Sequence, residues 1–143
     1  MKTAVIYWSG TGNTEAMALA VANGARESGV EVDIKKVSEI TAEQAIAYDA
    51  IALGCPSMGA EVLEETEMEP FVSEIEKADG AKEKKLVLFG SYGWGAGEWM
   101  QNWNIRMRKA GFNLLQDGLI IQETPDEEGK NLCKQLGREL TKQ

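Results

Sequence analysis

Short apolar runs alternate with amphipathic helical segments along the whole chain, and this alternation limits the possible folds more than any other feature. Three runs are almost continuously apolar, as is typical of parallel strands buried on both faces, at residues 3–8, 50–54 and 85–90. Residues 30–34 instead alternate apolar with charged side chains and indicate an edge strand with one solvated face. A fifth strand is expected at residues 112–122, weakened in its middle by Gln116-Asp117-Gly118.

Five helical segments are expected between and after these strands. They lie at residues 13–28, after Thr41, from Pro70, through Met100 to Ala110, and from Pro125-Asp126 onward. The first ends before Gly29, a usual residue for a left-handed cap, and the last is expected to bury Leu132, Leu136 and Leu140. The pattern predicts an α/β three-layer sandwich, with a parallel sheet between two layers of helices, as a single domain over residues 1–143.

Composition excludes several functional classes. The 143 residues carry 15 Lys and Arg against 23 Asp and Glu, and this acid excess disfavours nucleic acid and anionic membranes as partners. Because the chain has no His, it lacks a Ser/His or Cys/His relay and an imidazole metal site, and no metal is expected. No apolar run approaches the ~18–20 residues of a membrane span or resembles a signal peptide. We therefore expect a cytoplasmic protein in which Cys55 and Cys133 stay reduced.

The loop after the first predicted strand has the composition of an anion site. It reads Ser9-Gly10-Thr11-Gly12-Asn13-Thr14 and leads directly into a helix. Two glycines allow a tight turn, while hydroxyl and amide side chains and the free N–H groups of the helix start point to one place. Phosphate is the usual anion at such a helix start. The alternative is a simple strand-to-helix turn in which Asn13 or Thr14 caps the helix.

The sequence of the same loop excludes several classes of phosphate-containing ligand. A nucleoside-triphosphate loop needs a Lys, and residues 3–25 contain none. A dinucleotide fingerprint needs a third glycine, but Glu15 stands in its place, and receiver domains need Asp residues clustered at strand ends. The remaining candidate is a terminal phosphomonoester held by neutral donors and the helix dipole.

The loops after the third and fourth predicted strands are rich in glycine and carry large polarisable side chains. They read Cys55-Pro56-Ser57-Met58-Gly59-Ala60-Glu61 and Ser91-Tyr92-Gly93-Trp94-Gly95-Ala96-Gly97. Ligands of parallel sheets bind beyond the carboxyl ends of the strands, so a planar aromatic ligand would fit between Met58 and Trp94. A Met or Trp is more often a core residue, which is the interpretation we prefer for Trp99 and Trp103.

Three motifs resemble the short-chain flavodoxins of anaerobic bacteria. They are Tyr7-Trp8-Ser9-Gly10-Thr11-Gly12-Asn13-Thr14-Glu15, Met58-Gly59-x-Glu61 and Gly90-Ser91-Tyr92-Gly93-Trp94-Gly95, in this order. The resemblance covers essentially the whole chain. It implies a flavodoxin-like five-stranded parallel sheet in order 2-1-3-4-5 with helices on both faces, and non-covalently bound FMN.

The resemblance also implies roles for individual residues. Residues 9–14 would hold the FMN phosphate, Trp94 would stack on the outer face of the flavin, and Met58 would lie on its inner side. Glu61 would accept a hydrogen bond from the flavin N3–H. The full set of expected cofactor contacts is Ser9, Gly10, Thr11, Gly12, Asn13, Thr14, Ser57, Met58, Gly59, Ala60, Glu61, Ser91, Tyr92, Gly93, Trp94 and Gly95.

The function that the resemblance implies is low-potential electron transfer, in which one electron moves between the semiquinone and hydroquinone forms of FMN and the protein has no catalytic residues. In the family, the peptide after the glycine turns over when the flavin gains an electron. A type II′ turn over Met58–Glu61 suits this change, since it needs positive φ only at Gly59. The alternatives are an FMN-dependent NAD(P)H quinone reductase on the same fold and a non-redox anion-binding regulatory module.

The acid excess is concentrated between Val37 and Glu76, where ten carboxylates and no Lys or Arg give −10, against +2 for the remaining residues. We interpret four of them as a rim that lowers the flavin potential and attracts basic faces of redox enzymes into transient contact: Glu61, Glu64, Glu65 and Glu67. Such partners include flavodoxin or ferredoxin reductases and oxidoreductases. Glu74 and Glu76 are interpreted as a solvated helix face. We expect a monomer.

Overall fold

A parallel sheet forms the centre of the protein, which we describe over residues 1–142 from a computed structural model. Its strands are β1 (Lys2–Tyr7), β2 (Glu31–Lys36), β3 (Ala50–Gly54), β4 (Lys85–Tyr92), β5 (Asn113–Leu114) and β6 (Leu119–Gln122). They are ordered β2-β1-β3-β4-β5, and β6 also pairs with β4. All of these pairings are parallel. The predicted fold class and strand order are therefore confirmed.

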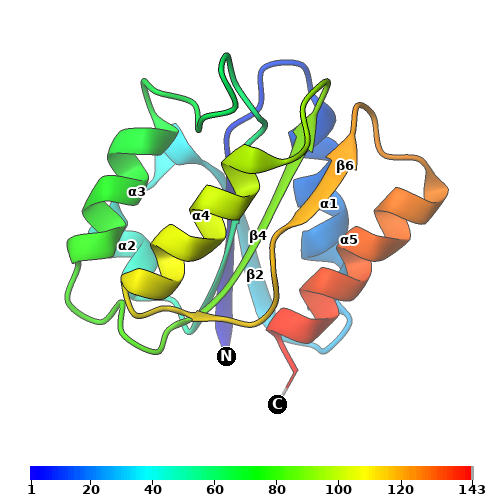
Figure 1. Cartoon of the computed structure of the whole chain (residues 1–143). Helices are drawn as coiled ribbons and strands as arrows, with labels where there is room; N and C mark the ends of the chain where they lie inside the picture. Colours follow the sequence, from blue (N-terminus) through cyan, green and yellow to red (C-terminus); the bar gives the residue numbers. More distant parts are fainter. Residues whose placement is uncertain (143) are drawn as a thin grey trace.

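Helices cover both faces of the sheet (Figure 1). The segments are α1 (Asn13–Arg26), the 3₁₀ turn η1 (Val37–Glu39), α2 (Ala42–Ile46), α3 (Met68–Lys77), α4 (Glu98–Lys109) and α5 (Glu127–Leu140). Helices α1 and α5 pack on one face, and α2, α3 and α4 pack on the other. Among residues 1–142, no helix is both long and apolar enough to cross a membrane.

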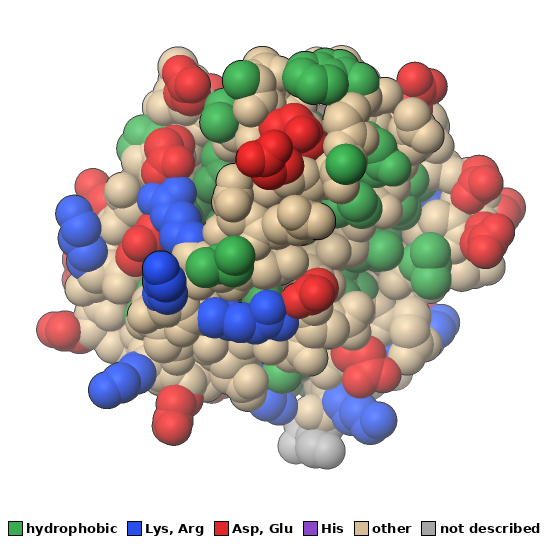
Figure 2. Space-filling model, in the orientation of Figure 1, with side chains coloured by type: hydrophobic (Ala, Val, Ile, Leu, Met, Phe, Trp, Pro, Cys, Tyr) green, Lys and Arg blue, Asp and Glu red, His purple; other side chains and the backbone are tan. Residues whose placement is uncertain are grey.

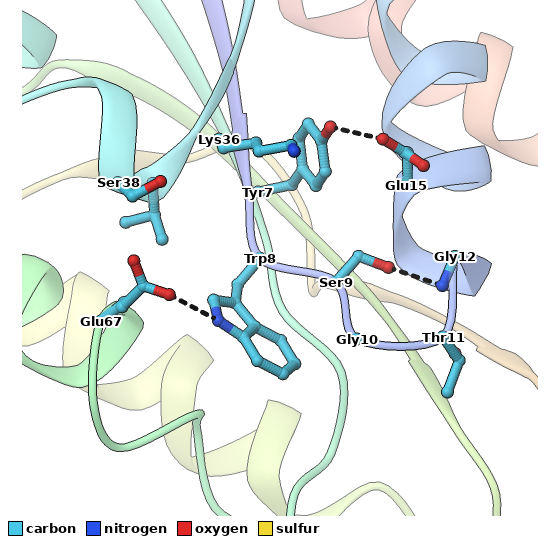
Figure 3. Close-up of a pocket in the computed structure, with 11 residues that line it drawn as sticks. Tyr7, Trp8, Ser9, Gly10, Thr11, Gly12, Glu15, Lys36, Ser38 and Glu67 are labelled. Carbon is cyan, nitrogen blue, oxygen red and sulfur yellow. Dashed lines mark hydrogen bonds between the residues drawn. The ribbon is translucent and has the colours of Figure 1, made fainter.

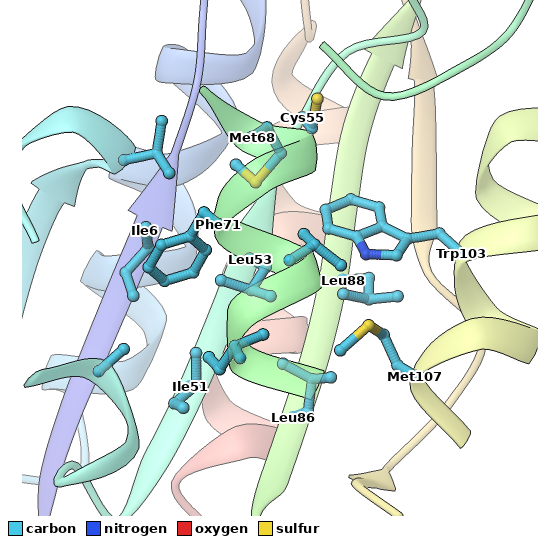
Figure 4. Close-up of a cluster of buried hydrophobic side chains, with 14 of the residues drawn as sticks. Ile6, Ile51, Leu53, Cys55, Met68, Phe71, Leu86, Leu88, Trp103 and Met107 are labelled. Atoms are coloured by element: carbon cyan, nitrogen blue, oxygen red, sulfur yellow. The ribbon is translucent and has the colours of Figure 1, made fainter. Parts of the chain in front are cut away.

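The central strands are mostly apolar because each strand serves two cores. In β1, Ala4 and Ile6 join the core under α2, α3 and α4, whereas Val5 and Tyr7 join the core under α1 and α5. Figure 4 shows the first of these cores, in which side chains of the sheet meet those of α3 and α4. Alternate side chains of a strand point to opposite faces, so two covered faces require a continuous apolar run.

The fifth strand is divided at the predicted weak point. Residues 113–114 pair with the start of β4 and residues 119–122 pair with its end. Four residues, 115–118, therefore stand opposite only two residues of β4, and the extra length leaves the sheet. Asn104 of α4 holds this excursion by accepting the Gly118 N–H at 2.9 Å.

One face of α5 differs from the prediction. Leu132 was expected in the core but is 50% exposed, whereas Cys133 is fully buried with Leu136 and Leu140. The buried residues of α5 are Gly129, Cys133, Leu136, Gly137 and Leu140. The error has a geometric cause, because residues adjacent on a helix point about 100° apart and the smaller Cys side chain gives a weaker apolar signal.

Candidate functional site

Four loops meet at the carboxyl end of the sheet, at the top of Figure 1. They follow β1, β3, β4 and β6. The first three were predicted from their composition, and the fourth, at residues 123–126, was not. Glu123 in this loop has a φ of 57° and donates its N–H to Tyr92 O at 2.8 Å. This bond holds the fourth loop beside the loop after β4.

The loop after β1 opens helix α1 without a side-chain cap. The N-cap residue is Gly12, whose φ of 97° is left-handed, and within residues 1–142 no side chain accepts a hydrogen bond from the first turn. Neither Asn13 nor Thr14 therefore caps the helix, in contrast to the simple-turn alternative. The N–H groups at the start of α1 and the positive end of its dipole remain available to an anion.

The sequence predicted that the polar side chains of this loop point to one place. In the structure they do not all do so. Ser9 Oγ accepts the Gly12 N–H at 3.0 Å and braces the loop from inside. Thr14 is buried, and its Oγ1 lies 2.8 Å from Ser91 Oγ at the end of β4. Asn13 Oδ1 accepts from the hydroxyl of Thr124 at 2.9 Å. Two of these contacts join the loop to the end of β4 and to the loop after β6, so these three segments form one connected unit.

A cavity of about 270 Å³ lies among the four loops. Eight of the predicted residues line it: Gly10, Thr11, Asn13, Ser57, Met58, Ser91, Tyr92 and Gly93. Trp8, Pro56 and Glu123 also line it and were not predicted. Trp8 directly follows β1 and Glu123 directly follows β6. The predicted site loops also begin directly after strands. No Lys or Arg is among the described residues that line this cavity.

A second cavity, of about 390 Å³, lies on the other side of the loop after β1 (Figure 3). Ser9 and Gly12 line it together with Lys36 from the end of β2. The loop after β1, residues 9–14, contains no Lys or Arg, so Lys36 is a basic group that the motif could not reveal. Tyr7 donates its hydroxyl to Glu15 Oε2 here at 2.7 Å, and burial together with this bond raises the pKa of Tyr7 to about 12.

The loop after β3 contains a tight hairpin. Met58 and Val62 exchange both backbone hydrogen bonds, at 2.9 and 3.0 Å, and Gly59 has the expected positive φ, 48°. The turn is nevertheless not the predicted four-residue type II′ turn. It closes one residue later, at Val62, because Glu61 also adopts a left-handed φ of 56°.

The Glu61 side chain joins this hairpin to the loop after β4. Its Oε1 accepts the N–H groups of Gly97 and Glu98 at 3.1 and 3.0 Å and so caps helix α4. Gly95 leaves room for this contact, since a Cβ atom there would lie 2.6 Å from the Glu61 carboxyl carbon. Among the described residues, Oε2 has no hydrogen-bond partner.

The tryptophans divide as predicted. Trp99 and Trp103 are each 1% exposed and belong to the core, whereas Trp94 is 66% exposed in its glycine-flanked loop. Tyr92 packs against Trp99 with ring centroids 5.8 Å apart. Core packing therefore does not explain Trp94.

One member of the predicted acidic rim is a structural residue. Glu64 is only 5% exposed and accepts the N–H groups of Thr66, Glu67 and Met68 at 2.7–3.0 Å, and also the Thr66 hydroxyl. Burial alone would raise its pKa, but these hydrogen bonds to the ionised form outweigh burial and lower it. Glu64 therefore caps α3 and is not free to meet a partner.

Glu76 also differs from its prediction as a solvated side chain. Arg106 of α4 pairs with Glu76 through Nε and binds Glu69 with both terminal nitrogens, at 2.8 and 2.6 Å. Glu74 is exposed, as expected. Figure 2 shows acidic and hydrophobic side chains at the loop end, at the top, with Lys and Arg side chains lower on this face.

The combined geometry fits a flat ligand that carries a phosphate. The uncapped start of α1 offers N–H donors at one end of the 270 Å³ cavity, while Met58 and Tyr92 offer apolar walls at the other. The chain adds β2 on one side of β1 and β3 on the other, so the strand order reverses between β1 and β3, and the cavity lies beside this point.

Comparisons with known proteins agree with this geometry. The family described as Flavodoxin matches residues 5–137. The flavodoxin of Clostridium beijerinckii is 45% identical over 137 residues, which cover 95% of this chain and 96% of that protein. The flavodoxin of Megasphaera elsdenii is 41% identical over 138 residues, covering 96% and 97%. The solution structure of its two-electron reduced form superposes with a TM-score of 0.88 at 38% identity, covering 99% of both chains.

Proposed function

The chain belongs to the flavodoxin family, and from this premise we propose that FMN lies among the four loops, within a single domain of residues 1–143. Flavodoxins bind FMN non-covalently and transfer electrons between redox partners, and they are not enzymes. FMN supplies the one-electron chemistry when bound. The observation that carries the proposal is the start of α1 beside the 270 Å³ cavity, where the N-cap residue is Gly12 and no described side chain caps the helix.

In this proposal, the loop after β1 holds the phosphate mainly through its backbone. Gly12 turns the chain so that the first N–H groups of α1 face outward, and the Ser9 hydroxyl fixes that turn. Thr11 is exposed in the same loop and lines the cavity, so its hydroxyl is the side-chain donor best placed for the phosphate. Thr14 contributes its backbone, since its hydroxyl is bonded to Ser91.

The other loops hold the flavin ring in this proposal. Met58 and Trp94 cover its two faces, and the backbone around Ser57, Gly59, Ala60 and Gly93 meets its edge. Glu61 Oε2 accepts from the flavin N3–H while Oε1 stays on helix α4. Gly95 contributes the space that this arrangement of Glu61 requires.

The charges around the cavity favour a low reduction potential of the bound flavin. Glu123 lines the cavity, and Glu61, Glu65 and Glu67 lie in the loop after β3. Each added electron therefore enters a negative field, and repulsion of ~1.4 kcal/mol lowers a one-electron potential by about 59 mV. We also infer that the exposed carboxylates attract redox enzymes with basic docking faces, a contact that salt weakens.

FMN titration of the purified chain tests the proposal. We expect uptake of one FMN with loss of its free fluorescence, and at least about tenfold weaker binding by Gly12→Val, because a β-branched residue disfavours φ near 97°. Gly29→Val is the matched control. Gly29 also has a positive φ, 83°, and open space around it, but it lies at the far end of α1.

Equal FMN affinity of both variants, or a wild-type chain that takes up no FMN, contradicts the proposal. Mixing the FMN-loaded protein with NADH or NADPH alone tests the reductase alternative, which the flavodoxin relatives do not favour. We expect no rapid bleaching of the flavin, whereas direct bleaching would indicate hydride transfer.

A further inference from the structure

We propose that Trp8 and Glu67 form a tether that positions the loop after β1, residues 9–14, for its phosphate ligand, an inference that rests on the proposed function. Trp8 Nε1 donates to Glu67 Oε1 at 3.1 Å (Figure 3). The bond joins the residue after β1 to the residue before α3, across 59 positions of sequence. Neither residue is among the expected cofactor contacts.

The Trp8 end of the tether supports the first glycine of the loop. The backbone N–H of Trp8 donates to Gly54 O at 3.0 Å, which extends the pairing of β1 with β3 and fixes where the side chain starts. The indole then packs beneath Gly10, where a Cβ atom would lie only 3.1 Å from Cη2. Trp8 also lines both cavities that flank the loop, so it forms the wall between them.

The Glu67 end is anchored although its side chain is exposed. The Glu67 N–H donates to Glu64 Oε1 at 2.7 Å, and Glu64 is buried. A continuous set of contacts thus runs from the buried carboxylate through Glu67 and the indole to Gly10. In this arrangement, an acidic side chain strengthens an anion site by holding its backbone.

The sign of the effect separates this role from simple electrostatics. A carboxylate near a phosphate repels it, so charge alone predicts that removing Glu67 tightens FMN binding. The tether predicts weaker binding, because the loop loses its support. The effect must also depend on the phosphate, since riboflavin carries the same ring and ribityl chain without it.

The experiment is a titration of the wild-type chain and its variants with FMN and, separately, with riboflavin. We expect Glu67→Ala and Trp8→Phe each to weaken FMN binding about tenfold, the size of one charge-assisted hydrogen bond, and Glu67→Ala to change riboflavin binding less than about twofold. The double variant should lose no more than either single variant, because both remove one interaction. Glu67→Gln retains an acceptor oxygen and should stay within about threefold of wild type.

Glu65→Ala is the matched control, because it removes the same charge from an exposed side chain two residues earlier. It should not weaken FMN binding. The tether is overturned if Glu67→Ala binds FMN as tightly as wild type or more tightly, or if it loses riboflavin by the same factor as FMN. A wild-type chain that binds neither flavin instead overturns the proposed function, and the tether with it.

Discussion

The α1–α5 helix pair and the loops at the carboxyl end of the sheet are held by different interactions. Where the helices cross, backbone meets backbone. A Cβ atom at Gly24 would lie 1.9 Å from Lys134 O, and one at Gly137 would lie 2.0 Å from Val21 O. In the loops, carboxylates meet backbone N–H groups, with Glu61 on α4 and Glu64 on α3. The helix pair is fixed by shape and the loops by hydrogen bonds to charged groups.

This difference changes the interpretation of the acidic window, the segment from Val37 to Glu76 that holds ten carboxylates. Close packing of the helices tolerates no added atom, but it does not depend on ionisation. A carboxylate cap depends on its charge, and one cap can be lost while the others remain. Several of the window's carboxylates are therefore structural parts of the cofactor loops. Glu65 and Glu74 are exposed and remain available to partners.

Gly24→Ala should have the largest effect, because the added methyl group meets the carbonyl of Lys134 and α1 must move away from α5. We expect the free energy of unfolding, measured with urea, to fall by about 3 kcal/mol or more. Gly129→Ala on α5 is the control. Its Cβ atom would lie 3.1 Å from Ile121 Cδ1, the end of a side chain that can move, so its cost should stay within about 1 kcal/mol. Equal losses would mean that the crossing is not tight.

Glu64→Ala should have the next largest effect, since it leaves three backbone N–H groups at the start of α3 without their acceptor. We expect a loss of about 2 kcal/mol in the same urea measurement. Glu65→Ala, which removes the neighbouring exposed carboxylate, should change stability by less than about 0.5 kcal/mol. Similar values for the two variants would show that Glu64 is not a cap.

The fold could be predicted from the sequence because its signals are direct. Ile51 and Leu88 lie in strands covered on both faces, so burial makes their strands mostly apolar. The prediction failed at Leu132, where two neighbouring helical positions compete and packing against α1 selects Cys133. Such a choice depends on the partner helix, which the local pattern does not contain.

The site could be predicted only where a loop has an unusual composition. Gly12, Gly59 and Trp94 became candidates in this way, whereas Lys36 reaches its cavity from the end of β2 and Glu123 reaches the other cavity from a loop without a motif. Glu64 looks like any other member of a run of glutamates. Only the position of the α3 N-terminus distinguishes it, and that is set by tertiary packing.

Acidification should affect the loop region specifically. Because the folded-state pKa of Glu64 lies below its ordinary value of 4.5, its ionisation stabilises the fold above that pH, and this contribution is lost as the pH falls through the folded-state pKa. The stability difference between wild type and Glu64→Gln, from urea unfolding at several pH values, should be constant above about pH 5 and narrow below pH 4.5. For Leu136→Ala in the helix pair, the difference should not depend on pH. A constant difference for both variants would refute the cap's dependence on charge.

Gly59→Ala should have the smallest effect and tests how independent the loops are. The space around Gly59 is open, so the only cost is that of a left-handed φ in a residue with a Cβ atom, about 1 kcal/mol. Gly93→Ala is the control, because Gly93 has open space and no positive φ. If the hairpin opens without unfolding the sheet, Gly59→Ala should increase amide exchange within residues 58–62 and leave urea unfolding almost unchanged. If the whole cost instead appears in the free energy of global unfolding, the hairpin and the helix pair unfold as one unit. The two regions would then differ in the interactions that hold them but not in when they unfold.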